Sequence, residues 1–193
     1  MEKIIIMSSF YNNYYQKLKD AFESKGQSTI FNNDRMHNAT IMCFMLDHCN
    51  KINMYCGEMS VLREKFYDKI EEKERNEFKE RISDKITRFL SEEGKQFNII
   101  VENYDVDNAN DLICKDVIRD GIKNKKISIK CLKDSYPYKG NSDHFCIADE
   151  KMVRLEIDKE DHTAMCVFND TDYTKLFTES FAKLNNYSET RSI

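Results

Sequence analysis

The stretch from Asp143 to Asp170 reads DHFCIADEKMVRLEIDKEDHTAMCVFND and carries the clearest pattern in the chain. Apolar residues recur in three short runs, 144–148, 152–157 and 163–168, and charged residues separate the runs. Short alternating runs with charged turns are typical of an antiparallel meander of strands. The same stretch gathers His144, Arg154 and Glu156, and an amphipathic segment follows from about 172 to 184. It therefore predicts a small sheet that carries ionisable side chains and ends in a helix.

Outward from this stretch, strand and helix patterns alternate back to residue 51. The sequence predicts strands over 51–56, 97–102 and 127–132, helices over 61–70, 78–90 and 112–122, and a loop over 134–142. Strands that alternate with helices require crossovers over the faces of a sheet. We therefore expect an α/β fold, a mixed sheet flanked by helices on both faces.

The first fifty residues have a different pattern. Phe10, Tyr14, Leu18 and Phe22 recur at helical spacing before Gly26, a second helix is expected over 38–49, and the polar, Asn-rich segment 27–35 is expected to be a loop. We expect a helical N-terminal appendage over 1–50 and the α/β domain over 51–193. One interpretation is that these helices dock a protein partner, which predicts exposed apolar surface around Phe10, Tyr14 and Tyr15.

Composition indicates a compact protein without an overall basic field. The chain has 193 residues, 40% of them hydrophobic and 33% charged, and a formal net charge of −4. A nucleic-acid contact would therefore have to come from a local patch, such as segment 123–126 with Lys130 and Lys133. The seven cysteines form no C-x-x-C pair and are expected to be reduced thiols, so the protein is expected to be cytoplasmic. We expect no metal site, no cofactor and no membrane contact.

The meander and the helices before it resemble one half of a phospholipase D-like phosphodiesterase, over about residues 51 to 185. That family has a histidine, a lysine two positions later, an aspartate further on, and then a Gly-Ser and an Asn. His144 matches the histidine, but Cys146 stands at the lysine position and Lys151 at the aspartate position. The Gly-Ser segment is replaced by Arg154-Leu155-Glu156.

The resemblance implies a particular chemistry for an active member. One histidine attacks phosphorus, a second protonates the leaving oxygen, and basic groups hold the non-bridging oxygens. A single half supplies one histidine, so activity would require a homodimer. In this sequence His144 would be the nucleophile and Glu156 would orient it, while Arg154 or Lys151 would bind phosphate.

Two hypotheses follow. The first is a degenerate, non-catalytic module that binds a phosphate-containing ligand, nucleic acid or a protein partner. The alternative is a divergent homodimeric phosphodiesterase or nuclease that uses His144. A third interpretation of the same residues is a structural polar network that fixes the meander. Asp149 is interpreted as a turn former rather than a base.

A second candidate site lies in the turn after strand 51–56. Gly57 and Ser60 are expected to present backbone N–H groups to an anion at the carboxyl end of a strand, where ligands bind in open α/β sheets. Glu58 and Arg63 are expected to face the same cleft. The alternative is an ordinary strand-to-helix turn in which Ser60 is the N-cap. Cys56, beside this turn, is expected to be buried rather than nucleophilic.

Overall fold

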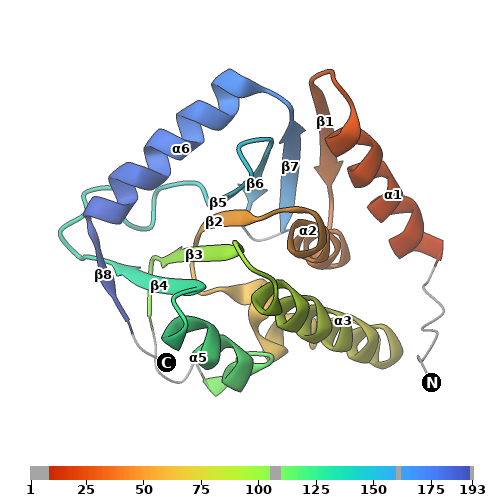
Figure 1. Ribbon diagram of the computed structural model, residues 1–193, viewed down its shortest axis with the longest axis horizontal. Coiled ribbons are helices and arrows are strands. Elements are labelled where there is room, and N and C mark those ends of the chain that lie inside the picture. The colour runs from red at the N-terminus through yellow and green to blue at the C-terminus, as the bar shows by residue number, and fades with distance from the viewer. Residues whose placement is uncertain (1–8, 105–109, 160–161, 192–193) are drawn as a thin grey trace.

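The computed structural model describes residues 9–104, 110–159 and 162–191 (Figure 1). Their strands form one mixed sheet of eight strands in the order β1-β7-β6-β5-β2-β3-β4-β8. The strands are β1 (Ser28–Asn32), β2 (Lys51–Cys56), β3 (Gln96–Val101), β4 (Ile127–Leu132), β5 (Phe145–Ala148), β6 (Met152–Asp158), β7 (Thr163–Phe168) and β8 (Ser188–Thr190).

The centre of the sheet is parallel and its flanks are antiparallel. β2, β3 and β4 run parallel to one another, and β5 pairs antiparallel with β2. β5, β6 and β7 then form the meander that the sequence predicted, in the register Phe145↔Leu155 and Leu155↔Met165. This arrangement brings the start of β5 to the carboxyl ends of β2 and β3. The predicted α/β fold with a mixed sheet is confirmed.

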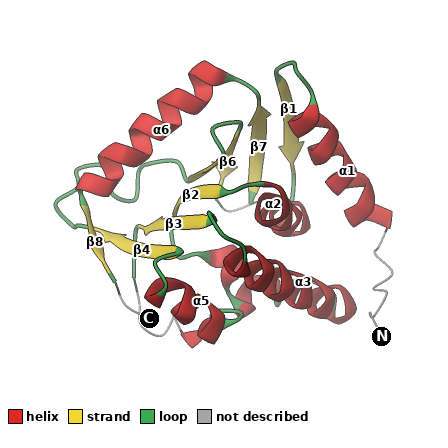
Figure 2. Ribbon diagram, viewed as in Figure 1, coloured by secondary structure: helices red, strands yellow, loops and turns green. Residues whose placement is uncertain are grey.

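Helices cover both faces of the sheet (Figure 2). One face packs against α1 (Ser9–Glu23), α2 (Arg35–His48), α3 (Glu72–Ser91) and α5 (Lys115–Lys123), and the other packs against α6 (Thr171–Asn186). Side chains of β2 alternate between the two cores, with Ile52 and Met54 on the first face and Tyr55 on the α6 face. Each fully buried large apolar side chain contributes roughly 1.5–3 kcal/mol.

The predicted loop over 27–35 is wrong. Residues 28–32 form β1, which pairs antiparallel with β7 at the edge of the sheet, in the register Ile30↔Cys166. The segment is too short and too polar to reveal a strand by itself, and its pairing with a distant strand decides the structure. Tyr11, Leu18 and Phe44 from the first fifty residues also belong to the main core. The division into 1–50 and 51–193 stays a prediction, but in the described residues the sheet and the core run across residue 50.

The predicted helix over 61–70 is also wrong. Two short 3₁₀ helices, Ser60–Leu62 and Glu64–Tyr67, occupy this segment. They are separated by Arg63, whose backbone is extended (φ −110°, ψ 144°) and forms an isolated bridge with Leu112. The apolar residues at helical spacing are buried here without a continuous helix. The sequence also missed β8, a strand of three residues.

The predicted apolar docking surface on the first helix is not exposed at its tyrosines. Tyr14 is buried in the core, and the half-buried Tyr15 donates a hydrogen bond of 2.6 Å from its hydroxyl to Asp47. The side chain of Phe10 lies outside the described residues. Across the described ranges, no helix has both the length and the apolar character needed to span a bilayer.

Candidate functional site

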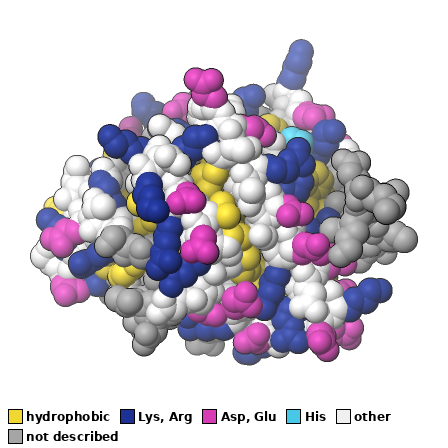
Figure 3. Space-filling model, turned by 60° about the horizontal axis from the view of Figure 1, so that its bottom comes forward, with side chains coloured by type: hydrophobic (Ala, Val, Ile, Leu, Met, Phe, Trp, Pro, Cys, Tyr) yellow, Lys and Arg dark blue, Asp and Glu magenta, His cyan; other side chains and the backbone are white. Residues whose placement is uncertain are grey.

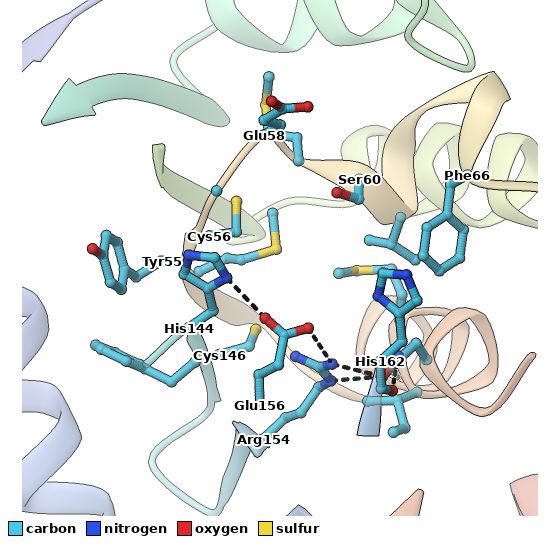
Figure 4. Close-up of a pocket in the computed structure, with 18 of the residues that line it drawn as sticks. Tyr55, Cys56, Glu58, Ser60, Phe66, His144, Cys146, Arg154, Glu156 and His162 are labelled. Atoms are coloured by element: carbon cyan, nitrogen blue, oxygen red, sulfur yellow. Dashed lines mark hydrogen bonds and ion pairs between the residues drawn. The ribbon is translucent and has the colours of Figure 1, made fainter. Parts of the chain in front are cut away.

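A pocket of about 180 Å³ opens where β2 ends and β5 begins. It brings together the two candidate sites that the sequence suggested separately, since His144 and Glu156 share it with Gly57, Glu58 and Ser60. The turn after β2 forms one wall, and the meander forms the other (Figure 4). The pocket therefore lies beyond the carboxyl end of a central strand, as expected for ligand sites in open α/β sheets.

His144 lies between two carboxylates. Its Nδ1 is 2.8 Å from Oε2 of Glu156, and its Nε2 is 3.4 Å from Oε2 of Glu102. Nε2 is buried and has no hydrogen-bond partner among the described residues, so its contact with Glu102 is an ion pair without hydrogen-bond geometry. Gly57 makes room for the ring, because a Cβ at that position would lie 3.1 Å from Cε1 of His144. Both ring nitrogens therefore face carboxylates, not the open part of the pocket.

The two carboxylates favour the protonated imidazole. Burial lowers the pKa of His144, but the contacts with Glu102 and Glu156 outweigh burial and raise the pKa above the ordinary value of 6.5. Burial raises the pKa of Glu102, and its contacts with His144 and Tyr55 outweigh this and lower it to about 2. The pKa of Glu156 is lowered as well, since His144 and Arg154 outweigh its burial. The two carboxylates therefore shift His144 toward its protonated form and match the charge of that form locally.

Glu102 is the residue of this cluster that the sequence analysis missed. It directly follows β3, its side chain is 6% exposed, and it accepts a hydrogen bond of 2.6 Å from the hydroxyl of Tyr55. The rule that ligand-site residues follow the carboxyl ends of parallel strands would have found it.

Arg154 shares a face of β6 with Glu156, as the strand period predicted. Its Nε and Nη2 donate to Oδ1 of Asn38 at 3.0 and 2.7 Å, and Nη2 is 3.6 Å from Oε1 of Glu156. Asn38 is buried, comes from α2, and donates to the backbone carbonyl of His162 at 2.8 Å. The dashed contacts in Figure 4 run from His144 through Glu156 to Arg154. The guanidinium is thus held by Asn38 and Glu156.

Cys146 occupies the position at which the phospholipase D motif has lysine. The thiol is buried, its Sγ lies 3.5 Å from Sδ of Met45, and burial raises its pKa. It is therefore an uncharged group in the apolar wall. Cys56 lines the same pocket, and burial raises its pKa to about 12, so it is not an activated nucleophile.

Two predicted binding residues lie outside the pocket. Lys151 is exposed on the turn between β5 and β6, where its Nζ lies 5.6 Å from the ring centroid of Phe22. Arg63 is 2% exposed and bridges Glu58 and Asp111, with nitrogen–oxygen distances of 2.6 and 3.3 Å. Glu58 and Arg63 were expected to face the same cleft, and of these two residues only Glu58 lines the pocket.

Asp149 is a turn former, as interpreted from the sequence. It has a left-handed backbone (φ 50°) and accepts hydrogen bonds of 2.7 to 2.9 Å from the backbone N–H groups of Asn50 and Lys51. It therefore connects the turn after β5 to the start of β2. No cluster of three or more His, Cys, Asp or Glu side chains in the described part of the chain is arranged to hold a metal ion.

Comparisons with known proteins identify the fold. No protein-family model matches the chain, and no curated protein matches it. Nuc, a phospholipase D family member from Salmonella typhimurium, is 11% identical with a TM-score of 0.52, over 87% of this chain and 99% of Nuc. NucT from Helicobacter pylori is 11% identical with a TM-score of 0.53, over 86% of this chain and 100% of NucT.

The fold is phospholipase D-like. A further similar structure is that of TrmBL2, an archaeal chromatin protein that shows a novel mode of DNA binding. It is 12% identical with a TM-score of 0.57, and the match covers 93% of this chain and 60% of TrmBL2. At these identities the similarity concerns the fold. Within this fold His144 and Glu156 are paired, and Cys146 and Lys151 stand where the family motif has lysine and aspartate.

Proposed function

We propose that this protein is a phospholipase D-like binding module that holds a ligand in the pocket and does not hydrolyse phosphodiesters. The observation that carries this proposal is the position of His144 between Glu102 and Glu156, with Nε2 buried against Glu102. A nucleophilic imidazole needs an unprotonated nitrogen that can reach phosphorus. Here the two carboxylates shift the ring toward the protonated form, Nδ1 contacts Glu156, and Nε2 is buried against Glu102.

The remaining surroundings support the same proposal. A phosphoryl-transfer site needs fixed positive groups where negative charge develops on the non-bridging oxygens. Cys146 supplies no charge at the lysine position, and Arg154 donates to Asn38. The pocket therefore lacks the positive groups that phosphoryl transfer needs, which supports a degenerate, non-catalytic module.

Among the three ligand classes considered, we favour nucleic acid, because TrmBL2, which shares the fold, binds DNA. The predicted basic cluster, segment 123–126 with Lys130 and Lys133, is partly neutralised by its own contacts. In the predicted basic cluster, Lys126 donates to the backbone carbonyl of Glu92 at 2.8 Å, and Lys133 lies 3.7 Å from Glu189. Figure 3 shows Lys and Arg side chains mixed with Asp and Glu side chains on one face. Binding that releases few counterions depends only weakly on salt concentration.

The proposal is tested by hydrolysis and binding assays on one preparation. We expect no hydrolysis of bis(4-nitrophenyl) phosphate or of single- and double-stranded DNA above the rate of a His144→Gln variant. Fluorescence anisotropy should detect binding of labelled single-stranded DNA with a shallow salt dependence. Hydrolysis that disappears in His144→Gln would overturn the proposal.

The alternative is a divergent homodimeric phosphodiesterase or nuclease, and the 2.8 Å pair of His144 and Glu156 is the observation in its favour. It requires His144 of a second copy near a two-fold axis, and it requires Nε2 to leave Glu102. Multi-angle light scattering would establish the oligomeric state. If this alternative holds, a Glu102→Gln variant, which frees Nε2 of His144, should gain phosphodiesterase activity. A dimer that is inactive both as the native chain and as the Glu102→Gln variant would exclude it.

A further inference from the structure

The pocket is the right size for a single ring. Its volume of about 180 Å³ is slightly larger than the apolar cavity of about 150 Å³ that binds benzene in an engineered protein. A ring of six atoms with one or two substituents therefore fits, whereas a stretch of sugar-phosphate backbone does not fit inside.

The walls of the pocket are mostly apolar and contain several sulfur atoms. The apolar side chains that line it are Ile41, Met42, Met45, Met54, Cys56, Met59, Val61, Phe66, Phe145 and Cys146. Methionine thioethers make favourable contacts with aromatic rings and adapt to their shape. Figure 4 places Phe66 across the pocket from His144. These walls suit a flat, weakly polar group rather than a hydrated anion.

Most charged groups at the polar end of the pocket are paired with protein groups of opposite charge. Arg154 lies 3.6 Å from Glu156, Glu58 lies 2.6 Å from Arg63, and His144 lies between Glu102 and Glu156, which raise its pKa. His162 is uncharged at neutral pH, because burial and the nearby Arg35 lower its pKa. A phosphate would therefore lose its hydration without meeting a net positive charge.

We propose that the pocket binds an uncharged aromatic or heteroaromatic ring, with a hydrogen-bonding substituent directed at Arg154 and Glu156, and that Glu102 excludes anionic ligands by matching the charge of His144. This inference rests on the proposed function, because it assumes binding without hydrolysis. Two sources supply such a ring: a free small molecule, or an unstacked base of a nucleic acid strand.

The test compares p-cresol with 4-methylphenyl phosphate, which carries the same ring with an anionic group. Isothermal titration calorimetry at pH 6.0 should give p-cresol at least tenfold tighter binding than the phosphate ester, and inorganic phosphate should show no binding at the same concentrations. Equal or tighter binding of the phosphate ester, or no binding of p-cresol, would overturn the inference. Hydrolysis of bis(4-nitrophenyl) phosphate would instead overturn the proposed function, so the two failures are distinguishable.

Variants place the binding in the pocket. Val61→Phe, which fills the pocket, should weaken p-cresol binding at least tenfold, and Ser60→Phe at the exposed rim provides the same test if Val61→Phe folds poorly. Glu102→Gln should raise the affinity for 4-methylphenyl phosphate about tenfold, whereas Lys183→Gln, at an exposed position outside the pocket, should change neither affinity. Unchanged binding in both filling variants would contradict the proposal.

A competition experiment separates the two sources of the ring. Displacement of p-cresol by a 15-mer of oligothymidylate would identify a nucleic acid base as the ligand. Displacement by thymine alone would identify a free small molecule. Failure of Glu102→Gln to change the preference between p-cresol and its phosphate ester would remove Glu102 as the residue that sets specificity.

Discussion

Two basic side chains in this molecule, Arg63 and His144, each lie between two carboxylates, and the two clusters differ in their exposure to solvent. Arg63 is 2% exposed and bridges Glu58 and Asp111, whose side chains are 43% and 29% exposed. His144 is 13% exposed and lies between Glu102 and Glu156, which are 6% and 13% exposed. The carboxylates of the Arg63 cluster are therefore accessible to solvent, whereas both carboxylates of the His144 cluster are largely shielded from it.

The difference separates a structural role from a ligand-binding one. Arg63 is always charged and connects the segment after β2 to the loop before α5, so it fixes the backbone at every pH. His144 is titratable, and its protonated form matches the charge of the two carboxylates beside the pocket. The pocket wall therefore depends on a proton in a way that the Arg63 cluster does not.

Removal of His144 should have the largest effect on stability. Without the ring, Glu102 and Glu156 remain buried with less compensation, and breaking a buried ion pair in this way typically costs about 3–5 kcal/mol. We expect His144→Ala to lower the free energy of unfolding by that amount at pH 6, measured by urea denaturation.

A double variant tests the cause of that loss. His144→Gln with Glu102→Gln keeps a hydrogen-bonding pair but removes both charges, so it should recover more than half of the stability lost in His144→Ala. If the double variant is as unstable as His144→Ala, lost packing rather than uncompensated charge explains the effect.

Removal of Arg63 should have a smaller effect. Both of its carboxylate partners reach water, so the loss should fall between that of a surface pair and that of a fully buried pair, about 2–3 kcal/mol for Arg63→Ala. Urea denaturation measures it, and Arg63→Met, which keeps the apolar stem, should be less harmful. A loss as large as that of His144→Ala would show that exposure of the carboxylates does not distinguish the two clusters.

The pH dependence of stability should come from the His144 cluster. Because the folded-state pKa of His144 is raised by the two carboxylates, its contribution is complete below 6.5 and is lost as the pH rises through the raised pKa. Glu102 behaves in the opposite direction, and its contribution is lost as the pH falls from 4.5 to about 2. Urea denaturation from pH 5 to pH 9 should show falling stability above 6.5 in the native chain and a flatter profile in His144→Gln. If the native chain and His144→Gln show the same dependence of stability on pH, His144 is not the source of that dependence.

The sequence predicted the fold well where a segment carries its own signal. β2, β4 and β7 have the expected bounds, because their apolar runs end at clear turn residues. The edge strands β1 and β8 were missed, since each is short and is fixed by pairing with a distant strand. The helix over 61–70 failed because Arg63 forms long-range contacts that interrupt it.

The candidate site was predicted in part for a similar reason. The pairing of His144 with Glu156 follows from strand periodicity and register, which are local properties. The contacts of Glu102 and Asn38 depend on how β3 and α2 pack around the meander, and no sequence spacing encodes that packing. The sequence therefore identified His144, Arg154 and Glu156, but neither Glu102 nor the pairing of these charges.

Substitution of Lys151 should have the smallest effect on stability, and it serves as a control for the His144 and Arg63 variants. The sequence placed it in the binding site by its position in the motif, whereas in the structure it is exposed on a turn outside the pocket. We expect Lys151→Ala to change the free energy of unfolding by less than about 0.5 kcal/mol, as is usual for a surface substitution. Binding of p-cresol should be unchanged, because the charges that balance in the pocket do not include this one. A clear loss of binding in Lys151→Ala would mean that the ligand extends beyond the pocket along the turn, and the charge balance would then have to include Lys151.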